Sequence, residues 1–304
     1  MRVLTVGSGF VGRAVGTALA ASGTDVVLAS RTPLVPPPHP WLPLDATDAE
    51  ACARTVERAE PDALVLVHGP SDVTWCESHP KEARDGHVGA TRALVRAAAG
   101  RRIVMISTDN VFDGRAEQYD EYAATAPANA YGAAKLAAEH TLLEESDQAT
   151  VLRVSLVYGL DPLRTGNWLN YFELCVRQLR LGETVQAPAD QWVTPVLVDD
   201  VAAVTRAVVT APAPELLHLG GPERLSRARW AGLVAERLGV PAERVSPVPK
   251  ASSRYASRPE NTCLSSALLA SAPATRGIRV RGAREGVRVL LPETGSGRAN
   301  GIPC

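Results

Sequence analysis

The chain has 304 residues, of which 45% are hydrophobic, and its 32 Lys and Arg against 33 Asp and Glu give a net charge of −1. This balance argues against a nucleic-acid or anionic-membrane surface, and the apolar content allows one large core or two coupled cores. No CxxC pair occurs among the five cysteines, so neither a zinc site nor a disulfide framework is predicted. No apolar run approaches the length of a membrane span, and no signal peptide precedes the first strand. We therefore expect a cytoplasmic protein that acts on a small molecule and holds no metal.

A glycine loop follows the first predicted strand. Strand (3–6), loop (GSGFVG, 7–12) and helix (13–22) follow one another at the spacing of a dinucleotide site. Gly7 permits the tight turn, Gly9 lets the backbone approach a pyrophosphate, and Gly12 allows close helix packing. The helix N-terminus adds amides and the positive end of a dipole. The alternative is an ordinary tight turn. The cofactor contacts predicted here are Gly7, Ser8, Gly9, Phe10, Val11 and Gly12.

The end of the second strand (25–29) bears on the choice of cofactor. A NAD-selective site often has a carboxylate here for the ribose 2′-hydroxyl, but this chain has Ser30 and Arg31. These groups can neutralise and hydrogen-bond a 2′-phosphate, so we predict that NADP(H) is preferred over NAD(H). A surface arginine at a strand end is the alternative. A proline-rich stretch (33–40) leads to a short strand (41–44), after which Asp45 and Ala46 can border the adenine, although Asp45 can equally cap the next helix.

Two further apolar runs, at 62–67 and 102–106, are typical of buried parallel strands, with a helix at 86–99 between them. Loops that follow parallel strands line the ligand crevice. The hydroxyl of Thr108 could there hold a carbonyl oxygen, although Thr after a strand is also common as a turn or cap. The candidates in these loops are Val67, His68, Gly69 and Ser107 for the cofactor, and Ser71, Asp72 and Asn110 for the substrate.

The alanine-rich segment at 128–140, ANAYGAAKLAAEH, favours a helix. Tyr131 and Lys135 would project from one face of it, one turn apart. A phenol titrates near ~10, and an adjacent ammonium would bring its pKa closer to working pH by stabilising the phenolate. The pair could therefore protonate or deprotonate a substrate oxygen, although this spacing is also typical of a solvated helix face. Since the chain has only three lysines, a lysine at this position favours the proton-transfer role over the solvated helix face.

The C-terminal half predicts a second lobe. A helix is expected over 168–179, and its aromatic residues could contact a sugar or base or simply form core. Further helices are expected with caps near Asp199 or Asp200 and at Ser226. For a nucleotide diphosphate the candidate cations are Arg177, Arg180, Arg254 and Arg258. The substrate contacts predicted in this half are Asn167, Trp168, Gln191 and Arg258.

Together these elements predict an α/β fold, with a Rossmann-type doubly wound parallel sheet and a smaller, mostly C-terminal substrate-binding lobe. We expect an NADP-binding domain over 1–160 and 192–220, a substrate-binding lobe over 161–191 and 221–291, and a flexible tail over 292–304.

Eight segments resemble those of extended short-chain dehydrogenases/reductases, and within them the dTDP-4-dehydrorhamnose reductase family of sugar-nucleotide ketoreductases. They are GSGFVG (7–12), SDVTWCES (71–78), STDNVFDG (107–114), YGAAK (131–135), LRVSLVYG (152–159), DQWVTPVLVDDVA (190–202), GGPERLSR (220–227) and RPEN (258–261). The resemblance implies that Thr108, Tyr131 and Lys135 are the catalytic trio, with Lys135 also holding the nicotinamide ribose. It further implies that the nicotinamide is bordered by the stretch at 153–157, including Val154, Ser155 and Val157. The substrate would be a nucleotide-linked ketosugar, and a homodimer is also expected.

The chain departs from the family pattern at three places. Its glycine loop is one residue shorter than the family's commoner form, His68-Gly69-Pro70 stands where small residues are usual, and His87 occupies a position that often carries asparagine. His87 could serve as a proton relay or be a packed helix histidine. Sugar-nucleotide dehydratases have an Asp-Glu pair after the threonine, and the Asn110 of this chain therefore argues against dehydration.

Two alternatives to the sugar-nucleotide reductase stay open. The same trio could reduce a specialised-metabolite ketone or aldehyde without a nucleotide, which the unusual His68 and His87 would favour. Some members of this family resemble the enzymes but act as cofactor-binding regulatory subunits, such as the partner of methionine adenosyltransferase, and the resemblance therefore also allows a binding subunit.

Overall fold

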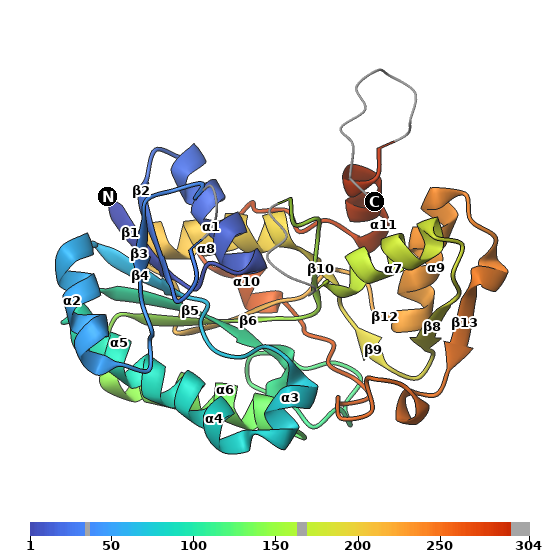
Figure 1. Ribbon diagram of the computed structural model, residues 1–304, viewed down its shortest axis with the longest axis horizontal. Coiled ribbons are helices and arrows are strands. Elements are labelled where there is room, and N and C mark those ends of the chain that lie inside the picture. The colour runs from blue at the N-terminus through green and yellow to red at the C-terminus, as the bar shows by residue number, and fades with distance from the viewer. Residues whose placement is uncertain (34–36, 163–168, 293–304) are drawn as a thin grey trace.

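The computed structural model describes residues 1–33, 37–162 and 169–292 (Figure 1). Its centre is a seven-stranded sheet in the order β11-β6-β5-β4-β1-β2-β3, in which every neighbouring pair is parallel. The strands are β1 (Arg2–Val6), β2 (Asp25–Ser30), β3 (Trp41–Pro43), β4 (Ala63–Leu66), β5 (Arg102–Thr108), β6 (Ala149–Val154) and β11 (Leu216–Leu219). The strand order reverses direction from β1, since β2 and β3 lie on one side and β4 to β6 on the other. This confirms the predicted doubly wound fold.

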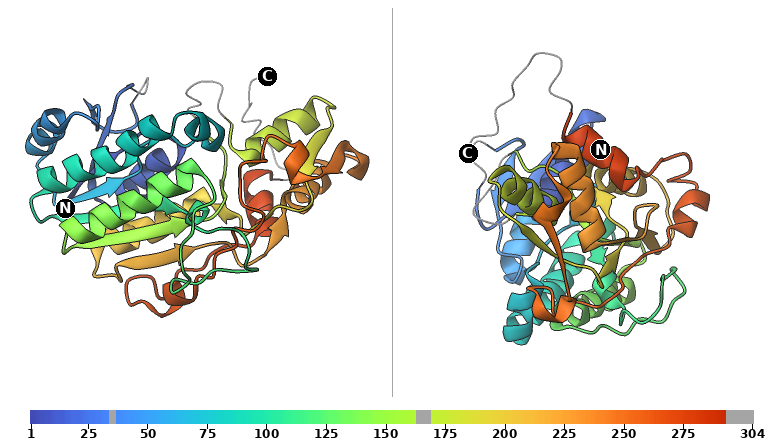
Figure 2. Two further views of the ribbon diagram at one scale, coloured as in Figure 1. Left: turned by 90° about the horizontal axis from the view of Figure 1, so that it is seen from below. Right: turned by 90° about the vertical axis from the view of Figure 1, so that its right-hand side faces the viewer.

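Helices cover both faces of this sheet. One face packs against α1 (Phe10–Ala21), α8 (Val198–Thr210) and α10 (Ala267–Ser271), and the other against α2 (Ala49–Ala59), α5 (Ala90–Ala98) and α6 (Ala130–Glu145). Figure 2 shows α5 and α6 side by side along the sheet. Short helices α3 (Val73–Ser78) and α4 (Pro80–Arg84) follow β4, and a π-helical turn at Asp85–Gly89 precedes α5. Both layers bury aliphatic side chains of the sheet, which is why its strands read as continuous apolar runs.

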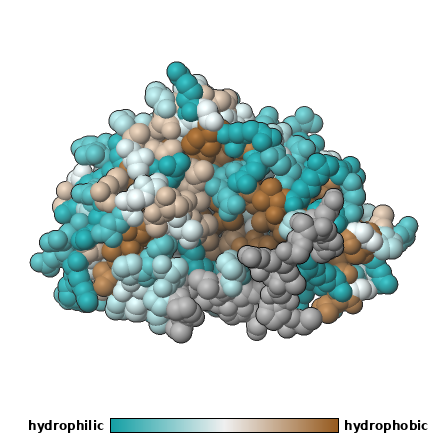
Figure 3. Space-filling model, turned by 90° about the horizontal axis from the view of Figure 1, so that it is seen from above, coloured by the Kyte–Doolittle hydropathy of each residue, from teal (hydrophilic) through white to brown (hydrophobic). Residues whose placement is uncertain are grey.

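A smaller body stands at the other end of the molecule (Figure 1). It contains α7 (Tyr171–Arg180), α9 (Arg227–Leu238) and α11 (Ala283–Leu290) around a buried core with Trp230 at its centre. Three two-stranded sheets accompany them: β8 (Val185–Pro188) with β13 (Val245–Val248), β9 (Trp192–Val193) with β12 (Leu225–Ser226), and β10 (Val196–Leu197) with β7 (Val157–Tyr158). Short 3-10 turns lie at Asp109–Val111, Ala242–Arg244 and Lys250–Ser252. Polar side chains dominate both ends of the face in Figure 3, and apolar ones gather between them.

Several predicted boundaries were wrong for local reasons. Helix α1 begins at Phe10, inside the glycine loop, because the Arg13 amide donates to the Gly9 carbonyl at 3.0 Å and so closes the first helical turn there. Neither Asp199 nor Asp200 caps α8, since Asp200 instead pairs with Arg281 at 2.6 Å. The cap predicted at the start of α9 is confirmed by the bond from the Arg229 amide to Ser226. The two-residue strands were not predicted because they are too short to show an alternating pattern.

Some predictions lie outside the described residues. Asn167 and Trp168 are among them, as is nearly all of the predicted tail. The described part of the second-lobe helix, α7, begins at Tyr171 with Asn170 and Glu173 forming a capping box. No helix in the described ranges is long and apolar enough to cross a membrane. The domain boundaries stay a prediction.

Candidate active site

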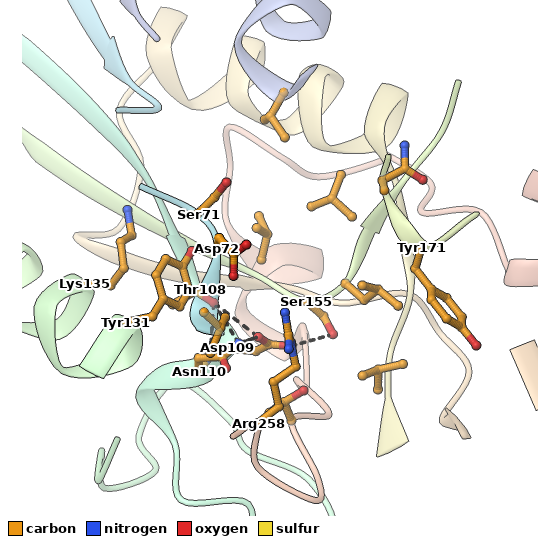
Figure 4. Close-up of a pocket in the computed structure, with 18 of the residues that line it drawn as sticks. Ser71, Asp72, Thr108, Asp109, Asn110, Tyr131, Lys135, Ser155, Tyr171 and Arg258 are labelled. Carbon is orange, nitrogen blue, oxygen red and sulfur yellow. Dashed lines mark hydrogen bonds between the residues drawn. The ribbon is translucent and has the colours of Figure 1, made fainter. Parts of the chain in front are cut away.

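A cavity of about 580 Å³ lies between the carboxyl ends of β4, β5 and β6 and the smaller body (Figure 4). The predicted residues that line it are Phe10, Val11, Val67, His68, Gly69, Ser71, Asp72, Ser107, Thr108, Asn110, Tyr131, Lys135, Val154, Ser155, Val157, Gln191 and Arg258. The predicted residues outside its lining are Gly7, Ser8, Gly9, Gly12, Ser30, Arg31, Asp45 and Ala46. These eight belong to the glycine loop and to the ends of β2 and β3. The chain therefore brings the catalytic candidates together, with the predicted phosphate and adenine contacts further along the same sheet edge.

The glycine loop has the shape of a phosphate cradle. A Cβ on Gly7 would lie 2.5 Å from the Val67 carbonyl oxygen, and one on Gly12 would lie 1.8 Å from the Gly7 carbonyl oxygen. A Cβ on Gly9 would meet no atom within 4 Å, so the N-terminus of α1 opens onto free space. Gly9 also carries no side chain that could cap the helix. Backbone amides at such an end suit a pyrophosphate, and the loop therefore fits the predicted dinucleotide.

The corner at the ends of β2 and β3 is held by Ser30. Its hydroxyl lies 2.7 Å from the Ser8 hydroxyl, accepts from the indole of Trp41, and donates to a backbone carbonyl. The exposed Arg31 lies near Asp45 and helps to lower the pKa of that carboxyl, whose main partner is Thr47. Asp45 therefore caps a turn, and the alternative role as the cap of α2 was wrong because Asp48 caps that helix.

Tyr131 and Lys135 both line the cavity from α6 (Figure 4). The ammonium of Lys135 donates to the Ile106 carbonyl at 2.7 Å, and burial lowers the pKa of Lys135 to about 8. Burial raises the pKa of Tyr131 above its ordinary value, and the main group opposing this rise is Thr108 rather than Lys135. The expectation that Lys135 brings the phenol towards neutral pH is thus not met here. Tyr131 stays protonated and can act as an acid.

A buried carboxyl stands beside Thr108. Asp109 accepts from Asn110 at 2.8 Å and from Ser155 at 3.0 Å, and burial raises its pKa. Ser155 in turn accepts from the Thr194 amide at 3.2 Å, so this carboxyl ties β5 to the smaller body. Sequence reasoning did not assign Asp109, because an aspartate after a strand reads as a turn residue.

The Ser107 hydroxyl donates to Glu139. Glu139 forms a buried ion pair with Arg153 at 2.7 Å, and its charge raises the pKa of Lys135 against the effect of burial. The Glu139 carboxylate therefore helps to keep the Lys135 ammonium charged.

Three arginines surround Tyr255 on the far wall of the cavity. The guanidinium carbons of Arg227, Arg258 and Arg254 lie 4.2, 5.0 and 5.7 Å from its ring centroid. Within the described residues none of these three groups forms an ion pair. Burial and the two neighbouring guanidinium groups lower the pKa of Arg258 to about 10, so it is still charged at neutral pH. Such a cluster attracts an anion with several oxygens.

A family model described as the RmlD substrate binding domain matches residues 1–294. The chain belongs to this family. A dTDP-4-keto-6-deoxy-D-glucose reductase from Streptomyces niveus is 32% identical over 210 residues, which cover 68% of this chain and 71% of that protein. Methionine adenosyltransferase 2 subunit beta from Rattus norvegicus is 29% identical over 71% of this chain and 66% of that protein. The family is thus one of NAD(P)-dependent reductases with a relative named as a subunit of another enzyme.

A crystal structure of dTDP-4-dehydrorhamnose reductase from Bacillus anthracis in complex with NADP has the same fold. Its TM-score is 0.80 at 23% identity, over 96% of this chain and 99% of that chain. The likeness supports the α/β architecture of this RmlD-family chain and, at that identity, nothing finer.

The two unusual histidines of this RmlD-family chain, His68 and His87, are both packed against neighbouring residues. The His87 ring lies edge-on to Tyr131, with centroids 5.8 Å apart, and its Nε2 lies 3.0 Å from the Pro70 carbonyl oxygen. The Nε2 atom of His68 lies 3.2 Å from the Thr91 hydroxyl oxygen. Burial lowers the pKa of His68 to about 4 and that of His87 well below its ordinary range, so both rings are neutral.

Sequence reasoning missed two residues of the arginine cluster. Arg227 follows the α9 cap and Tyr255 lies in an irregular stretch, and neither position carries a periodic signal. Of the four arginines first considered, Arg254 and Arg258 line the cavity, whereas Arg177 and Arg180 are exposed on α7 outside it. Asp72 has a second role as the cap of α3, and Gln191 accepts from Arg227 at 2.5 Å.

Proposed function

We propose that this protein is an NADPH-dependent ketoreductase that reduces the 4-keto group of a nucleotide-linked deoxysugar. The observation that carries the proposal is a single cavity lined both by Tyr131 and Thr108 and by the arginines around Tyr255. A ketone needs a proton donor for its oxygen, and a nucleotide diphosphate needs guanidinium partners. Both needs meet in one substrate if the sugar carbonyl lies at Tyr131 and the diphosphate near Arg258.

The chain's own groups divide the chemistry between them. NADPH, when bound, supplies the hydride that adds to the carbonyl carbon. Tyr131 donates its phenolic proton to the carbonyl oxygen, so that the ketone becomes an alcohol. The hydroxyl of Thr108 orients that oxygen and, as the main group opposing the rise in the Tyr131 pKa, stabilises the phenolate left on Tyr131. By family resemblance Lys135 holds the nicotinamide ribose.

The cofactor site supports NADP(H) over NAD(H). The glycine cradle suits a pyrophosphate, and Ser30 with Arg31 offers a hydroxyl and a cation at the end of β2. The related Bacillus anthracis reductase was crystallised with NADP, which supports the same choice. Residues Val67, His68 and Val154 to Val157 are the proposed neighbours of the nicotinamide. A cytoplasmic location and a homodimer stay predictions.

Two other functions have a specific observation in their favour. A carbonyl substrate without a nucleotide is favoured by the unusual His68 and His87, which line the cavity, His87 with its ring against that of Tyr131. A binding subunit is favoured by the similarity to methionine adenosyltransferase 2 subunit beta, although Thr108, Tyr131 and Lys135 are intact in this chain.

The deciding experiment is a substrate panel followed by NADPH oxidation. It compares a dTDP-4-keto-6-deoxyhexose with the free 4-keto-6-deoxyhexose and with aliphatic and aromatic ketones. We expect turnover of the nucleotide-linked sugar, with a much higher kcat/KM than for the free sugar. Turnover of the nucleotide-free ketones alone would refute the sugar-nucleotide assignment. NADPH binding without oxidation of any member would favour the binding subunit.

A further inference from the structure

Two asparagine side chains connect the start of α6 to Thr108. Asn129 is the N-cap of α6, two residues before Tyr131, and Asn110 follows Thr108 by two residues in the turn after β5. The Asn129 amide nitrogen lies 3.1 Å from Asn110 Oδ1, and the Asn110 amide nitrogen lies 3.2 Å from Thr108 Oγ1. The family resemblance and the cavity lining gave Asn110 only a possible contact with substrate and gave Asn129 no role.

The orientation of the Asn129 side chain is fixed by a backbone group. The Gly132 amide donates to Asn129 Oδ1 at 2.8 Å, and a backbone N–H can only donate. The Asn129 Nδ2 group must therefore face the other way, where it donates to Asn110 Oδ1 and, at 3.3 Å, to the Ser257 carbonyl. The Gly132 N–H can only donate and the Ser257 carbonyl can only accept, so the amide cannot be turned over without losing both of these bonds.

The orientation of Asn110 follows from that of Asn129. Because Asn110 Oδ1 accepts from Asn129, its Nδ2 group points to Thr108 Oγ1 and to Asp109 Oδ1 at 2.8 Å. The backbone amide of Asn110 also donates to Thr108 Oγ1, at 3.2 Å. A hydroxyl oxygen has two lone pairs, and both now face N–H donors. Thr108 can therefore take part in a further hydrogen bond only by donating its own proton.

The Thr108 proton has one other acceptor nearby, Asp109, and this contact leaves the proton available for a further hydrogen bond. Thr108 Oγ1 lies 3.3 Å from Asp109 Oδ1, which is long for an O–H···O bond, and that oxygen already accepts from Asn110. The cavity and Tyr131 lie on the other side. A hydroxyl that donates towards the phenol oxygen would lower the pKa of Tyr131, and Thr108 is the first of the groups that oppose the rise in that pKa.

We propose that Asn129 and Asn110 are positioning residues that fix Thr108 as a hydrogen-bond donor towards Tyr131 and the substrate oxygen. This inference rests on the proposed ketoreductase function. When Thr108 is the donor, the Tyr131 hydroxyl does not donate to Thr108. Its proton is then available for the substrate oxygen. After the proton has moved, the same donation stabilises the phenolate.

The packing around the two amides leaves them little freedom. Asn129 is 6% exposed, and a Cβ on Gly132 would lie 2.0 Å from the Asn110 carbonyl oxygen, so the turn after β5 is pressed against the start of α6. The Ser257 carbonyl precedes Arg258, so Asn129 also ties the arginine segment to Thr108. The direction of the Thr108 proton is therefore set by the docking of three segments.

The substitution Asn129→Asp separates the role of residue 129 as the cap of α6 from its role in orienting the Asn110 amide. Asp is as good an N-cap as Asn, so α6 begins as before, but a carboxylate only accepts. Asn110 then turns its Nδ2 group towards residue 129 and its Oδ1 towards Thr108, which donates to it instead of to the substrate. We expect kcat to fall by at least about 10-fold while KM stays within about twofold, since one misdirected donor weakens the transition state. The neutral cap Asn129→Ser should give a smaller fall.

Two controls keep the activity test specific. Asp48→Asn exchanges the same groups at the cap of α2, away from the cavity, and should leave kcat unchanged. In the reverse reaction, alcohol oxidation requires the Tyr131 phenolate, so the rate rises with pH through the Tyr131 pKa. Loss of the Thr108 donor raises that pKa, and the profile of Asn129→Asp should therefore move to higher pH. A merely structural defect would lower the rate without moving the profile.

Neutron diffraction of the deuterated wild-type protein shows the orientation of the Asn110 amide and of the Thr108 hydroxyl, and it requires no catalytic activity. We expect deuterons on Asn110 Nδ2 directed at Thr108, and the Thr108 deuteron directed at Tyr131 or the cavity. The reverse amide orientation, or an Asn129→Asp variant with wild-type kcat and pH profile, would overturn the inference. Absence of any ketone reduction by the wild-type protein would instead overturn the proposed function, and the neutron map would still decide the amide orientation.

Discussion

The ring of His87 packs directly against Gly69. A Cβ on Gly69 would lie 2.2 Å from both Nδ1 and Cε1 of that ring, and Gly69 has a φ of +93°. The histidine that departs from the family pattern is thus accommodated by a glycine in the equally unusual His68-Gly69-Pro70 loop. The neutral ring can donate from Nε2 to the Pro70 carbonyl, which holds this loop against the π-helical turn.

Substituting Gly69→Ala should therefore cost more than backbone strain alone. A left-handed conformation costs a residue with a Cβ about 1–2 kcal/mol, and overpacking against His87 adds about 1–3 kcal/mol. Gly23→Ala is the matched control, because Gly23 has a φ of +82° with no atom within 4 Å of a Cβ. Urea unfolding should show a larger loss for Gly69→Ala, partly restored in the double variant with His87→Ala. Equal losses at Gly23 and Gly69 would contradict this packing argument.

The arginine cluster predicts that a cavity-lining arginine, Arg258, and an exposed one, Arg177, contribute differently to substrate binding. Removal of Arg258, which lines the cavity, should raise KM for a nucleotide-linked sugar by about 10-fold or more, since a charge-assisted hydrogen bond contributes about 1.5–3 kcal/mol. Arg177→Ala, on the exposed face of α7, should leave KM unchanged. The measurement is steady-state NADPH oxidation by Arg258→Ala and Arg177→Ala. If both variants kept the wild-type KM, the diphosphate would have to lie elsewhere.

The choice of cofactor depends on Arg31. Replacement by Asp would remove the cation for a 2′-phosphate and introduce a carboxylate of the kind that accepts a ribose 2′-hydroxyl. We expect Arg31→Asp to lose NADPH affinity and gain NADH affinity, measured by fluorescence titration of both nucleotides. Arg206→Asp, on the exposed side of α8, makes the same charge change as a control. Unchanged NADPH affinity in Arg31→Asp would show that its guanidinium is a surface group.

The burial of Lys135 predicts a pH dependence of stability. The pKa of Lys135 is about 8 in the fold, below its ordinary 10.5, because burial disfavours the ammonium. Between these values the unfolded chain binds more protons, so this contribution makes the free energy of unfolding rise with pH from about 8 towards 10. Urea unfolding across that range should show the wild type gaining stability relative to Lys135→Met. Relative to Lys81→Met, a variant at an exposed lysine, the wild type should not gain stability as the pH rises. If the difference in unfolding free energy between the wild type and Lys135→Met did not change with pH, the pKa of Lys135 would be near its ordinary value.

Much of the fold was predictable because its signals are local. The glycine loop, the continuous apolar strands and the Ser226 cap each depend on a few adjacent residues, and the doubly wound sheet follows from their order. The catalytic trio could be proposed because Thr108 ends a strand and Tyr131 and Lys135 share one helix face. These features need no knowledge of distant contacts.

The parts that were missed depend on contacts between distant segments. Asp200 pairs with Arg281, 81 residues away, and so does not cap α8 as its position suggested. The main partner opposing the raised pKa of Tyr131 is Thr108 from β5 rather than Lys135 one turn along, because Lys135 donates to Ile106 instead. No local pattern shows which acceptor a buried ammonium will find.

The most direct test of the central claim is the single-turnover rate of NADPH oxidation by Tyr131→Phe with a dTDP-4-keto-6-deoxyhexose. Removing the general acid should slow hydride transfer by about 10²–10⁴-fold while NADPH binding is retained. Tyr122→Phe, which removes the same hydroxyl from a side chain that is 82% exposed, should react at the wild-type rate. If Tyr131→Phe reduced the sugar as fast as Tyr122→Phe, Tyr131 would not be the proton donor and the proposed mechanism would be wrong.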